Sequence, residues 1–520
     1  MSKILSRLLQ KERGRLARAM KIPKLAGGPP ALLSALGFCR GFLLPLIALF
    51  VLTWAGCTLA PKYQRPAVAL SPNWPAVSEQ VTTNTIPAAD IGWRDFFRDP
   101  RLQRLVELAL TNNPDLRVAV LNVEQSRAQY RIQRSALLPE IDATGRGTRQ
   151  RLPADLSGTG QPMTVSQYSV NLGTASYELD LFGHVRSLKD VALENYFATE
   201  EARRGAQIAL VAEVGNACLM ERAVTEQLTV ARQTLAAVQA SYELTQRSYE
   251  AGVVSELDLR TAEGQVQTAR SNVAAYEQQL AEAEDNLVLL VGRPLPEDLP
   301  PPQPFGSADY LSDVPAGLPS DLLQRRPDIL GAEHQLKAAN ASIGAARAAF
   351  FPTVTLTASG GTASSQLANL FAPGSGTWMF SPQVTLPIFT AGRDLANLDA
   401  AKIGKQIEVA NYQKAIQTDF REVSDSLAAR ASVAVQLDAG EALVKAEQRR
   451  FELADARFRQ GVDSYLTVLS AQQDLYRAQE NLIQFQFSRW SSLINLYQAL
   501  GGGWLENSPQ PGTDQISNAK

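Results

Sequence analysis

The chain has 520 residues, among them 50 Lys and Arg and 52 Asp and Glu, and its formal net charge is −2. This balance gives no basic excess of the kind that binds nucleic acid. Only two His and three Cys occur, with no C-x-x-C spacing, so the sequence predicts no metal site, no cofactor and no His-based catalysis. We therefore do not expect an enzyme, and we expect Cys218, in an apolar helical run, to be a buried small residue.

Residues 1–56 have the features of a signal peptide. Basic residues come first, and a run of 14 mostly apolar residues, too short to span a bilayer, ends at Trp54. Two small residues then precede Cys57, as in the lipobox of bacterial lipoproteins, so we expect cleavage before Cys57 and a covalent lipid on it. Trp54 stands where that motif usually has Leu, three residues before the cysteine, and an ordinary signal peptide with an incidental cysteine is the alternative. Met20 is an alternative start to Met1.

The mature chain that begins at Cys57 is acidic. Removing residues 1–56 takes away nine basic residues and one acidic residue, which leaves 41 basic and 51 acidic residues and a net charge of about −10. This charge again argues against nucleic acid as a partner. No run of 18 or more apolar residues follows Cys57, so any part that crosses a membrane is expected to be a β-barrel. Residues 57–92 are rich in proline and predict an extended, lipidated strap.

The chain that follows the strap contains a tandem duplication. The stretch Asn-Pro-Asp-Leu at Asn113 returns as Arg-Pro-Asp-Ile at Arg326 with an offset of 213 residues, and Tyr-Glu-Ala-Gly at Tyr249 returns as Phe-Arg-Gln-Gly at Phe458 with an offset of 209. Such a duplication suits walls and rings better than a single asymmetric active site. The predicted parts are repeat 1 at 93–305, repeat 2 at 306–505 and a disordered tail at 506–520.

Both repeats are predicted to contain very long helices. Although the chain has 29 prolines, none occurs in residues 163–293 or 388–508. Proline costs about 3 kcal/mol inside a helix, so its absence over such lengths indicates long uninterrupted helices. Within 259–290, apolar residues alternate three and four positions apart, which is typical of a coiled-coil seam.

Each repeat also contains one β-patterned hairpin between its long helices, at about 139–182 in repeat 1 and 352–389 in repeat 2. In both, polar residues alternate with small or apolar ones on either side of a loop that contains Gly, Ser and Pro. Strands of about ten residues with one apolar and one polar face suit a transmembrane barrel, and a half-buried hairpin of a soluble protein is the alternative. Four strands cannot enclose a water-filled pore, so the chain is expected to oligomerise.

Several stretches together resemble one known family. They are 57–66, 93–99, 113–116, 499–504 and the duplicated turn Tyr/Phe-x-x-Gly-Val-x-Ser. They closely resemble the TolC-like outer-membrane factors, above all the OprM/NodT-type lipoproteins, and the likeness covers nearly the whole mature chain.

The resemblance implies a mainly α-helical fold with a β-barrel part. In such a homotrimer each protomer gives four strands to a shared twelve-stranded transmembrane barrel, which a long α-helical barrel continues through the periplasm. The implied function is a passive export duct in the bacterial outer membrane for drugs and toxic small molecules. It would belong to a tripartite efflux pump, RND-type or similar, or to a secretion system, and a periplasmic adaptor would couple it to an inner-membrane pump. The alternative is a periplasmic adaptor-like coiled-coil lipoprotein that bridges envelope components.

The resemblance also points to the turns near 249–258 and 458–467 as the periplasmic tips where an adaptor would dock. Glycine suits the left-handed residue after a helix, and serine suits the N-cap of the next helix. The family's tunnel narrows at these tips through rings of acidic residues, although one family position that carries Asp is serine in this chain. The candidate docking residues are Gly252, Val253, Ser255, Gly461, Val462 and Ser464, and the candidate constriction residues are Asp258, Asp463 and the substituted position, Ser470.

Overall fold

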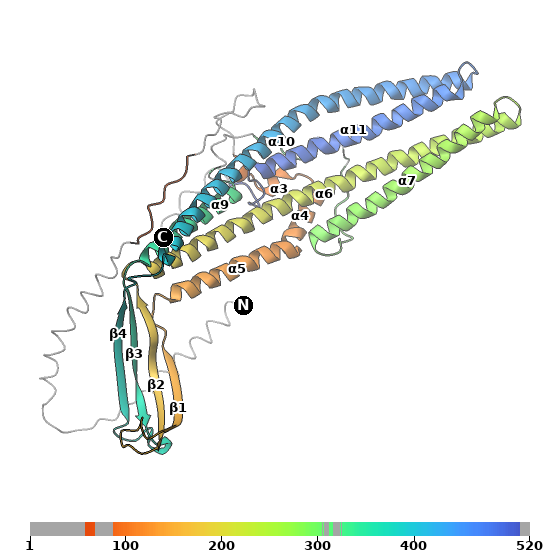
Figure 1. Ribbon diagram of the computed structural model, residues 1–520. Helices are drawn as coiled ribbons and strands as arrows, with labels where there is room; N and C mark the ends of the chain where they lie inside the picture. The colour runs from red at the N-terminus through yellow and green to blue at the C-terminus, as the bar shows by residue number, and fades with distance from the viewer. Residues whose placement is uncertain are drawn as a thin grey trace, which may run out of the picture. The chain divides into compact units, whose positions relative to one another are not determined.

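The computed structural model describes residues 58–67, 87–303, 305, 311–315, 323 and 325–509 (Figure 1). The predicted signal peptide and the candidate lipid site Cys57 lie outside the described residues. Contacts with the rest of the fold continue beyond the expected boundary at residue 505. The Ser508 N–H donates to the Asp95 carboxylate at 2.7 Å, and Glu506 pairs with Arg94. Residues 506–508 therefore pack against the fold rather than belonging to a disordered tail.

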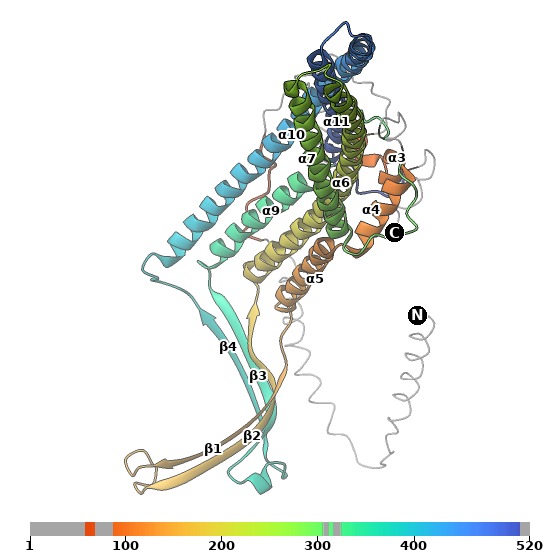
Figure 2. The same cartoon turned by 90° about the vertical axis from the view of Figure 1, so that its right-hand side faces the viewer.

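Two long helical hairpins dominate the described part of the chain (Figures 1 and 2). The helices α6 and α10 have 67 residues each, or about 100 Å, which confirms the prediction of very long helices. The helix α6 packs against α7, and α10 packs against α11. The helical elements are η1 (Ala88–Asp90), α3 (Trp93–Phe96), α4 (Pro100–Asn112), α5 (Pro114–Ser135), α6 (His184–Glu250), α7 (Glu256–Val291), α9 (Pro327–Ala348), η2 (Leu367–Asn369), α10 (Arg393–Arg459) and α11 (Tyr465–Ala499).

Shorter helices join the two hairpins. The helix α5 packs against α6, and α9 packs against both α6 and α10, so α9 connects the two repeats. The helix α4 packs against α6 and α7. Across the described ranges, no helix combines the length and the apolar character needed to cross a membrane.

The four strands form one antiparallel sheet at one end of the long helices (Figure 2). Each repeat contributes one strand hairpin, as predicted, and the order β1-β2-β3-β4 places the two hairpins side by side. The central pair carries an irregularity between Thr174 and Tyr177. Within the described chain β1 and β4 each have one strand neighbour, which leaves two unpaired edges. The strands are β1 (Asp142–Leu152), β2 (Met163–Leu179), β3 (Thr353–Ser364) and β4 (Gly376–Thr385).

The pairing register gives the sheet one apolar and one polar face. On one face Leu172 of β2 lies opposite Ala143 of β1 and Gly360 of β3, and Gly360 in turn lies opposite Trp378 of β4. We call this side the apolar sheet face; its large members are Tyr168, Val170, Leu172, Tyr177, Leu179, Val354, Leu356, Trp378, Phe380 and Val384. The other face carries mainly Thr, Ser, Asn and Gln, with Arg146 on β1. The predicted alternation of the strands is confirmed.

The main hydrophobic core lies where the short helices α3 and α4 meet the long ones. Phe96 stacks on Tyr497 of α11 with ring centroids 4.0 Å apart, and Leu105 and Leu219 are fully buried beside them. Cys218 of α6 is fully buried in the same cluster, as predicted, and burial raises the pKa of its thiol. The core therefore fixes the middle of α6 and α10 and the C-terminal ends of α7 and α11, and the helical tips extend away from it.

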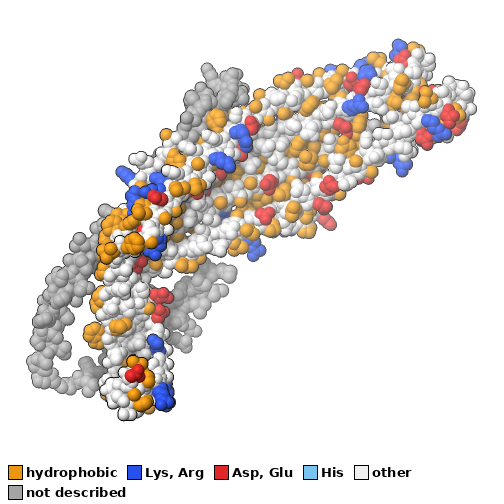
Figure 3. Space-filling view, viewed as in Figure 1, with side chains coloured by type: hydrophobic (Ala, Val, Ile, Leu, Met, Phe, Trp, Pro, Cys, Tyr) orange, Lys and Arg blue, Asp and Glu red, His pale blue; other side chains and the backbone are white. Residues whose placement is uncertain are grey.

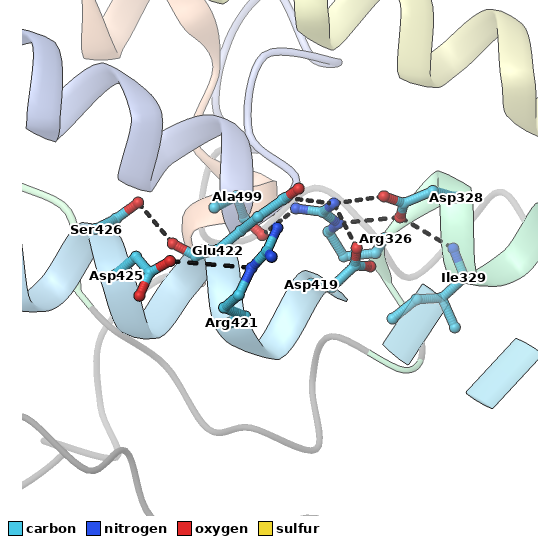
Figure 4. A network of polar contacts seen from close by, with 9 residues as sticks. All are labelled: Arg326, Asp328, Ile329, Asp419, Arg421, Glu422, Asp425, Ser426 and Ala499. Carbon is cyan, nitrogen blue, oxygen red and sulfur yellow. Dashed lines mark hydrogen bonds and ion pairs between the residues drawn. The ribbon is translucent and has the colours of Figure 1, made fainter. Parts of the chain in front are cut away.

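A buried arginine at the start of α9 connects three helices of repeat 2 through hydrogen bonds and ion pairs (Figure 4). The Arg326 guanidinium donates to the Ala499 carbonyl at the end of α11 at 2.7 Å and to Asp419 of α10 at 2.8 Å. It also pairs with Asp328 and Glu422. Burial raises the pKa of the Asp419 carboxyl in this cluster. One cation thus links α9, α10 and α11.

Repeat 1 has a different residue with different hydrogen bonds at the position that matches Arg326. Asn113 stands where repeat 2 has Arg326, and its side-chain oxygen caps α5 by accepting from the Leu116 N–H at 2.9 Å. Its amide group donates to the Leu290 carbonyl near the end of α7 at 2.8 Å. The two repeats therefore share the backbone plan and differ in the polar groups that hold it.

Candidate functional site: the two helical tips

The first tip is the turn between α6 and α7, at the end of the hairpin remote from the sheet (Figure 1). Gly252 follows the end of α6 in the left-handed conformation, with φ +73°. Its N–H donates to the Tyr249 carbonyl at 2.9 Å, and the Val253 N–H donates to the Ser248 carbonyl at 2.8 Å. These are the two hydrogen bonds of a Schellman motif, and they confirm the predicted role of Gly252 in the turn.

The helix α7 begins with a capping box. The Ser255 hydroxyl accepts a hydrogen bond from the Asp258 N–H at 3.2 Å, and the Asp258 carboxylate accepts one from the Ser255 N–H at 3.2 Å. The same carboxylate accepts a second hydrogen bond from the Ser255 hydroxyl at 2.7 Å. Ser255 is therefore the N-cap, as predicted. Asp258 has a local structural role at the positive end of a helix.

The second tip, between α10 and α11, has the same glycine turn as the first tip but lacks the side-chain cap at the start of the next helix. Gly461 has φ +72°, its N–H donates to the Phe458 carbonyl at 2.8 Å, and the Val462 N–H donates to the Arg457 carbonyl at 3.0 Å. Ser464 occupies the N-cap position of α11, but its side chain makes no capping hydrogen bond. The prediction of a serine cap is correct for the position and wrong for the hydrogen bond.

An ion pair stands beside this uncapped helix start. The Asp463 carboxylate accepts two hydrogen bonds from the Arg457 guanidinium, at 2.7 and 2.9 Å, and this pairing lowers the pKa of Asp463. The same protomer therefore balances the charge of this candidate constriction residue. The third candidate, Ser470, faces α10, with its hydroxyl oxygen 3.4 Å from a guanidinium nitrogen of Arg450.

Asp474, which the sequence analysis did not single out, lies one helical turn after Ser470. Its carboxylate accepts a hydrogen bond from Arg450 at 2.9 Å, and Glu447 pairs with the same guanidinium at 3.0 Å. The signal in the sequence was the spacing of four residues, which puts Asp474 on the same face of α11 as Ser470. A carboxylate is therefore present on that face, one turn further from the tip.

The surface of both tips is apolar at matching positions. The exposed fractions are 77% for Val253 and 76% for Leu257 at the first tip, and 59% for Val462 and 66% for Leu466 at the second. The sequence analysis included the two valines and missed the two leucines, although these leucines are separated by the same offset as the tip glycines. Exposed apolar side chains on a helix turn are available to a partner.

Polar contacts between α7 and α11 link the two helical hairpins, between the tips and the main hydrophobic core. Glu480 of α11 accepts a hydrogen bond from Tyr276 of α7, and Gln473 of α11 donates to Gln265 of α7 at 3.1 Å. Burial and the Glu480 carboxylate raise the pKa of Tyr276 to about 12. An open pocket of about 260 Å³ lies beside these contacts, and both polar and apolar side chains line it. The residues that line it include Thr234, Gln265, Asn272, Gln472, Tyr476 and Glu480.

The segment that follows Cys57 lies along α9. The Leu59 carbonyl accepts a hydrogen bond from Arg347 at 3.1 Å, at the end of α9 that leads into β3. Further along, Arg65 pairs with Glu333 of α9, and the Tyr63 hydroxyl donates to the same carboxylate at 3.1 Å. The described strap therefore starts near the sheet and runs away from it.

The family model described as "Outer membrane efflux protein" matches residues 105–293 and 318–502. The chain belongs to this family. The two matched blocks correspond to the two repeats and together cover more than half of the chain. The predictions of a TolC-like fold, an outer-membrane location and a role in efflux are thereby confirmed, and the finding favours the channel over the adaptor-like alternative.

Several efflux proteins and channels are similar to this outer membrane efflux protein. The toluene efflux pump outer membrane protein TtgC of Pseudomonas putida is 51% identical over 457 residues, which cover 88% of this chain and 94% of TtgC. The outer membrane protein OprJ of Pseudomonas aeruginosa is 43% identical over 458 residues, which cover 88% and 95% of the two chains. Among solved structures, the open state of the MtrE outer membrane channel of Neisseria gonorrhoeae has a TM-score of 0.79 and 40% identity, and the match covers 87% of this chain and 100% of that one.

Proposed function

We propose that three copies of this chain form a passive outer-membrane channel in which the four-stranded sheets close into one shared barrel. The observation that carries the proposal is the sheet itself, which has an exposed apolar face and unpaired edges at β1 and β4. Unpaired backbone groups are not tolerated in the hydrocarbon of a bilayer. Pairing of β1 in each copy with β4 of the next satisfies both edges and gives twelve strands, enough to enclose water.

The helices beside these edges support the same arrangement. The helix α5 leads into β1 and α10 follows β4, so a three-fold rotation that pairs the strands also brings α5 of one copy against α10 of the next. Both helices carry large exposed apolar side chains, which such an interface would cover. They are Val118, Leu121 and Ile132 on α5 and Leu395, Ile403 and Ile407 on α10.

The tips are the surface on which a periplasmic adaptor would dock, and the adaptor would couple the channel to an inner-membrane pump. This proposal draws on the exposed apolar side chains of both tips and on the family. Several relatives are named as components of pumps for toluene, solvents or antibiotics. Export of drugs and toxic small molecules is accordingly the substrate class that we assign. The chain itself would perform no catalysis, and the pump would supply the energy.

A lipid on Cys57 would anchor the channel beside its own sheet. The described strap starts next to Arg347, at the end of α9 that leads into β3, and Cys57 is only one residue before it. One residue spans at most about 3.6 Å, so acyl chains on Cys57 would lie near the periplasmic edge of the sheet. Two or more acyl chains would be needed for stable anchoring.

Negative-stain electron microscopy of the detergent-purified mature protein tests the trimer. We expect elongated three-fold particles with a detergent belt at one end, and stepwise conductance when the same preparation is added to a planar bilayer. Compact monomers, or elongated particles without a belt and without conductance, would refute the channel and favour an adaptor-like role.

A further inference from the structure

Two arginines continue the apolar sheet face beyond its last apolar row. Arg149 and Arg151 of β1 lie opposite Ser166 and Thr164 of β2, on the same side of the sheet as Tyr168. Both side chains are exposed. Figure 3 shows Lys and Arg side chains gathered on the part of the sheet remote from the helices. The two guanidinium groups therefore stand on the face that the proposed barrel turns toward lipid, at its loop end.

The depth of these arginines follows from the register. The apolar sheet face runs from the Val354 row to the Ser364 row of β3, ten residues or about 34 Å along the strand. A strand tilt of about 45° reduces this length to about 24 Å across the bilayer, close to the roughly 25 Å apolar band of outer-membrane barrels. Arg149 lies one row beyond the Ser364 row and Arg151 two rows beyond it, each row adding about 7 Å along the strand. Both groups are thus at the level of the outer-leaflet headgroups.

The positive charge at this level has little protein charge to balance it. In the described ranges neither guanidinium has an ion-pair partner, and the loop between β1 and β2 contains one acidic residue, Asp155. The strand that would flank β1 in the trimer is β4 of the next copy. Residues 365–385, which include β4 and the loop before it, contain no Asp or Glu. Trimer assembly would therefore leave the arginines without a protein counter-charge.

We propose that Arg149 and Arg151 bind the phosphate groups of an anionic glycolipid in the outer leaflet. Guanidinium groups bind phosphate through paired, charge-assisted hydrogen bonds, and two of them one row apart can engage one or two phosphates of a headgroup. The apolar residues below them, Tyr168 and Val170, would contact the acyl chains of the same lipid. The inference rests on the proposed trimer, because the trimer defines which face meets lipid.

The test compares lipid binding by the full lipidated protein and two sets of variants in detergent. Purified diphosphoryl lipid A is titrated, and thermal dissociation of the trimer is followed at fixed protein concentration. We expect lipid A to raise the dissociation temperature of the wild type, and the double variant Arg149→Gln/Arg151→Gln to bind about tenfold or more weakly. Arg146→Gln is the control on the polar face of the same strand; it removes one positive charge, as each of the two substitutions in the double variant does.

Three outcomes would overturn the inference. The first is unchanged lipid A binding by the double variant, and the second is an equal loss of lipid A binding in Arg146→Gln. The third is a stabilisation of the trimer by inorganic phosphate as large as that by lipid A, which would indicate a site for free anions. Conductance of the same preparations in phosphatidylcholine bilayers separates the two proposals. A wild type that conducts while the double variant keeps its lipid A binding refutes only the lipid site. A wild type that neither conducts nor forms trimers refutes the channel and the lipid site together.

Discussion

The left-handed glycines at the tips give the sharpest test of the docking proposal. In Gly252→Ala and Gly461→Ala a methyl group meets no atom within 4 Å, so the substitution adds backbone strain without a steric clash. A left-handed alanine costs about 1–2 kcal/mol, which raises the free energy of the Schellman turn relative to an opened turn by that amount. Because each 1.4 kcal/mol is a factor of ten, the ratio of opened to closed turns rises by about 5- to 30-fold, and this factor is the upper bound on the loss of adaptor affinity.

The assay measures adaptor binding to the immobilised channel together with amide exchange at the tips. Gly264→Ala is the matched control, because this glycine lies inside α7, has open space around it and has no positive φ. In a helix interior alanine is favoured over glycine by about 0.5–1 kcal/mol, so the control should bind normally and exchange no faster. Faster exchange in Gly252→Ala with unchanged adaptor binding would refute docking at the tip. Unchanged exchange would refute the strain argument itself.

Three further predictions concern the thiols, the caps and the buried arginine. In the native mature protein Cys218 should resist alkylation at pH 8, because burial raises the pKa of its thiol, and it should react after denaturation; a second reactive thiol then would mean that Cys57 carries no lipid. Ser255→Ala should destabilise the start of α7 by about 1 kcal/mol, whereas Ser464→Ala should destabilise the start of α11 by far less, because only Ser255 makes a capping hydrogen bond. Equal changes in amide exchange at the two helix starts would contradict this difference. Arg326→Met should lower the free energy of unfolding by about 3–5 kcal/mol, since it leaves the buried Asp419 carboxylate without a counter-charge; a thermal unfolding curve that matches the wild type would contradict it.

The elements of this fold were predictable because they depend on local patterns. The absence of proline over 163–293 and 388–508 predicted helices longer than any ordinary core requires, and α6 and α10 have that length. Alternation predicted the four strands, and the tip glycines predicted the two reversals. Each of these signals depends on the conformational preferences of the residues themselves and indicates a backbone conformation directly.

The polar groups that hold the fold were not predictable, because their partners are distant in the chain. Arg326 meets Asp419 across 93 residues, and Tyr276 meets Glu480 across 204. Ser464 looks in sequence as good a cap as Ser255, yet only Ser255 has an aspartate three residues later that completes a capping box. The choice between two similar serines therefore depends on a neighbouring side chain rather than on the serine itself.

The duplication explains why one chain is insufficient for the proposed function. Each repeat supplies one strand hairpin and one helical hairpin, and pairing of β2 with β3 joins the two repeats within a chain. The remaining edges, β1 and β4, belong to different repeats, so the contact between neighbouring copies would again join repeat 1 to repeat 2. A closed trimer then alternates the two repeats around one axis. Its tips share the glycine turn and differ in the cap: α7 starts on a side-chain capping box, whereas an ion pair stands beside the start of α11. Salt screens such an exposed ion pair more than it weakens a capping box, so high ionic strength should loosen the second tip first.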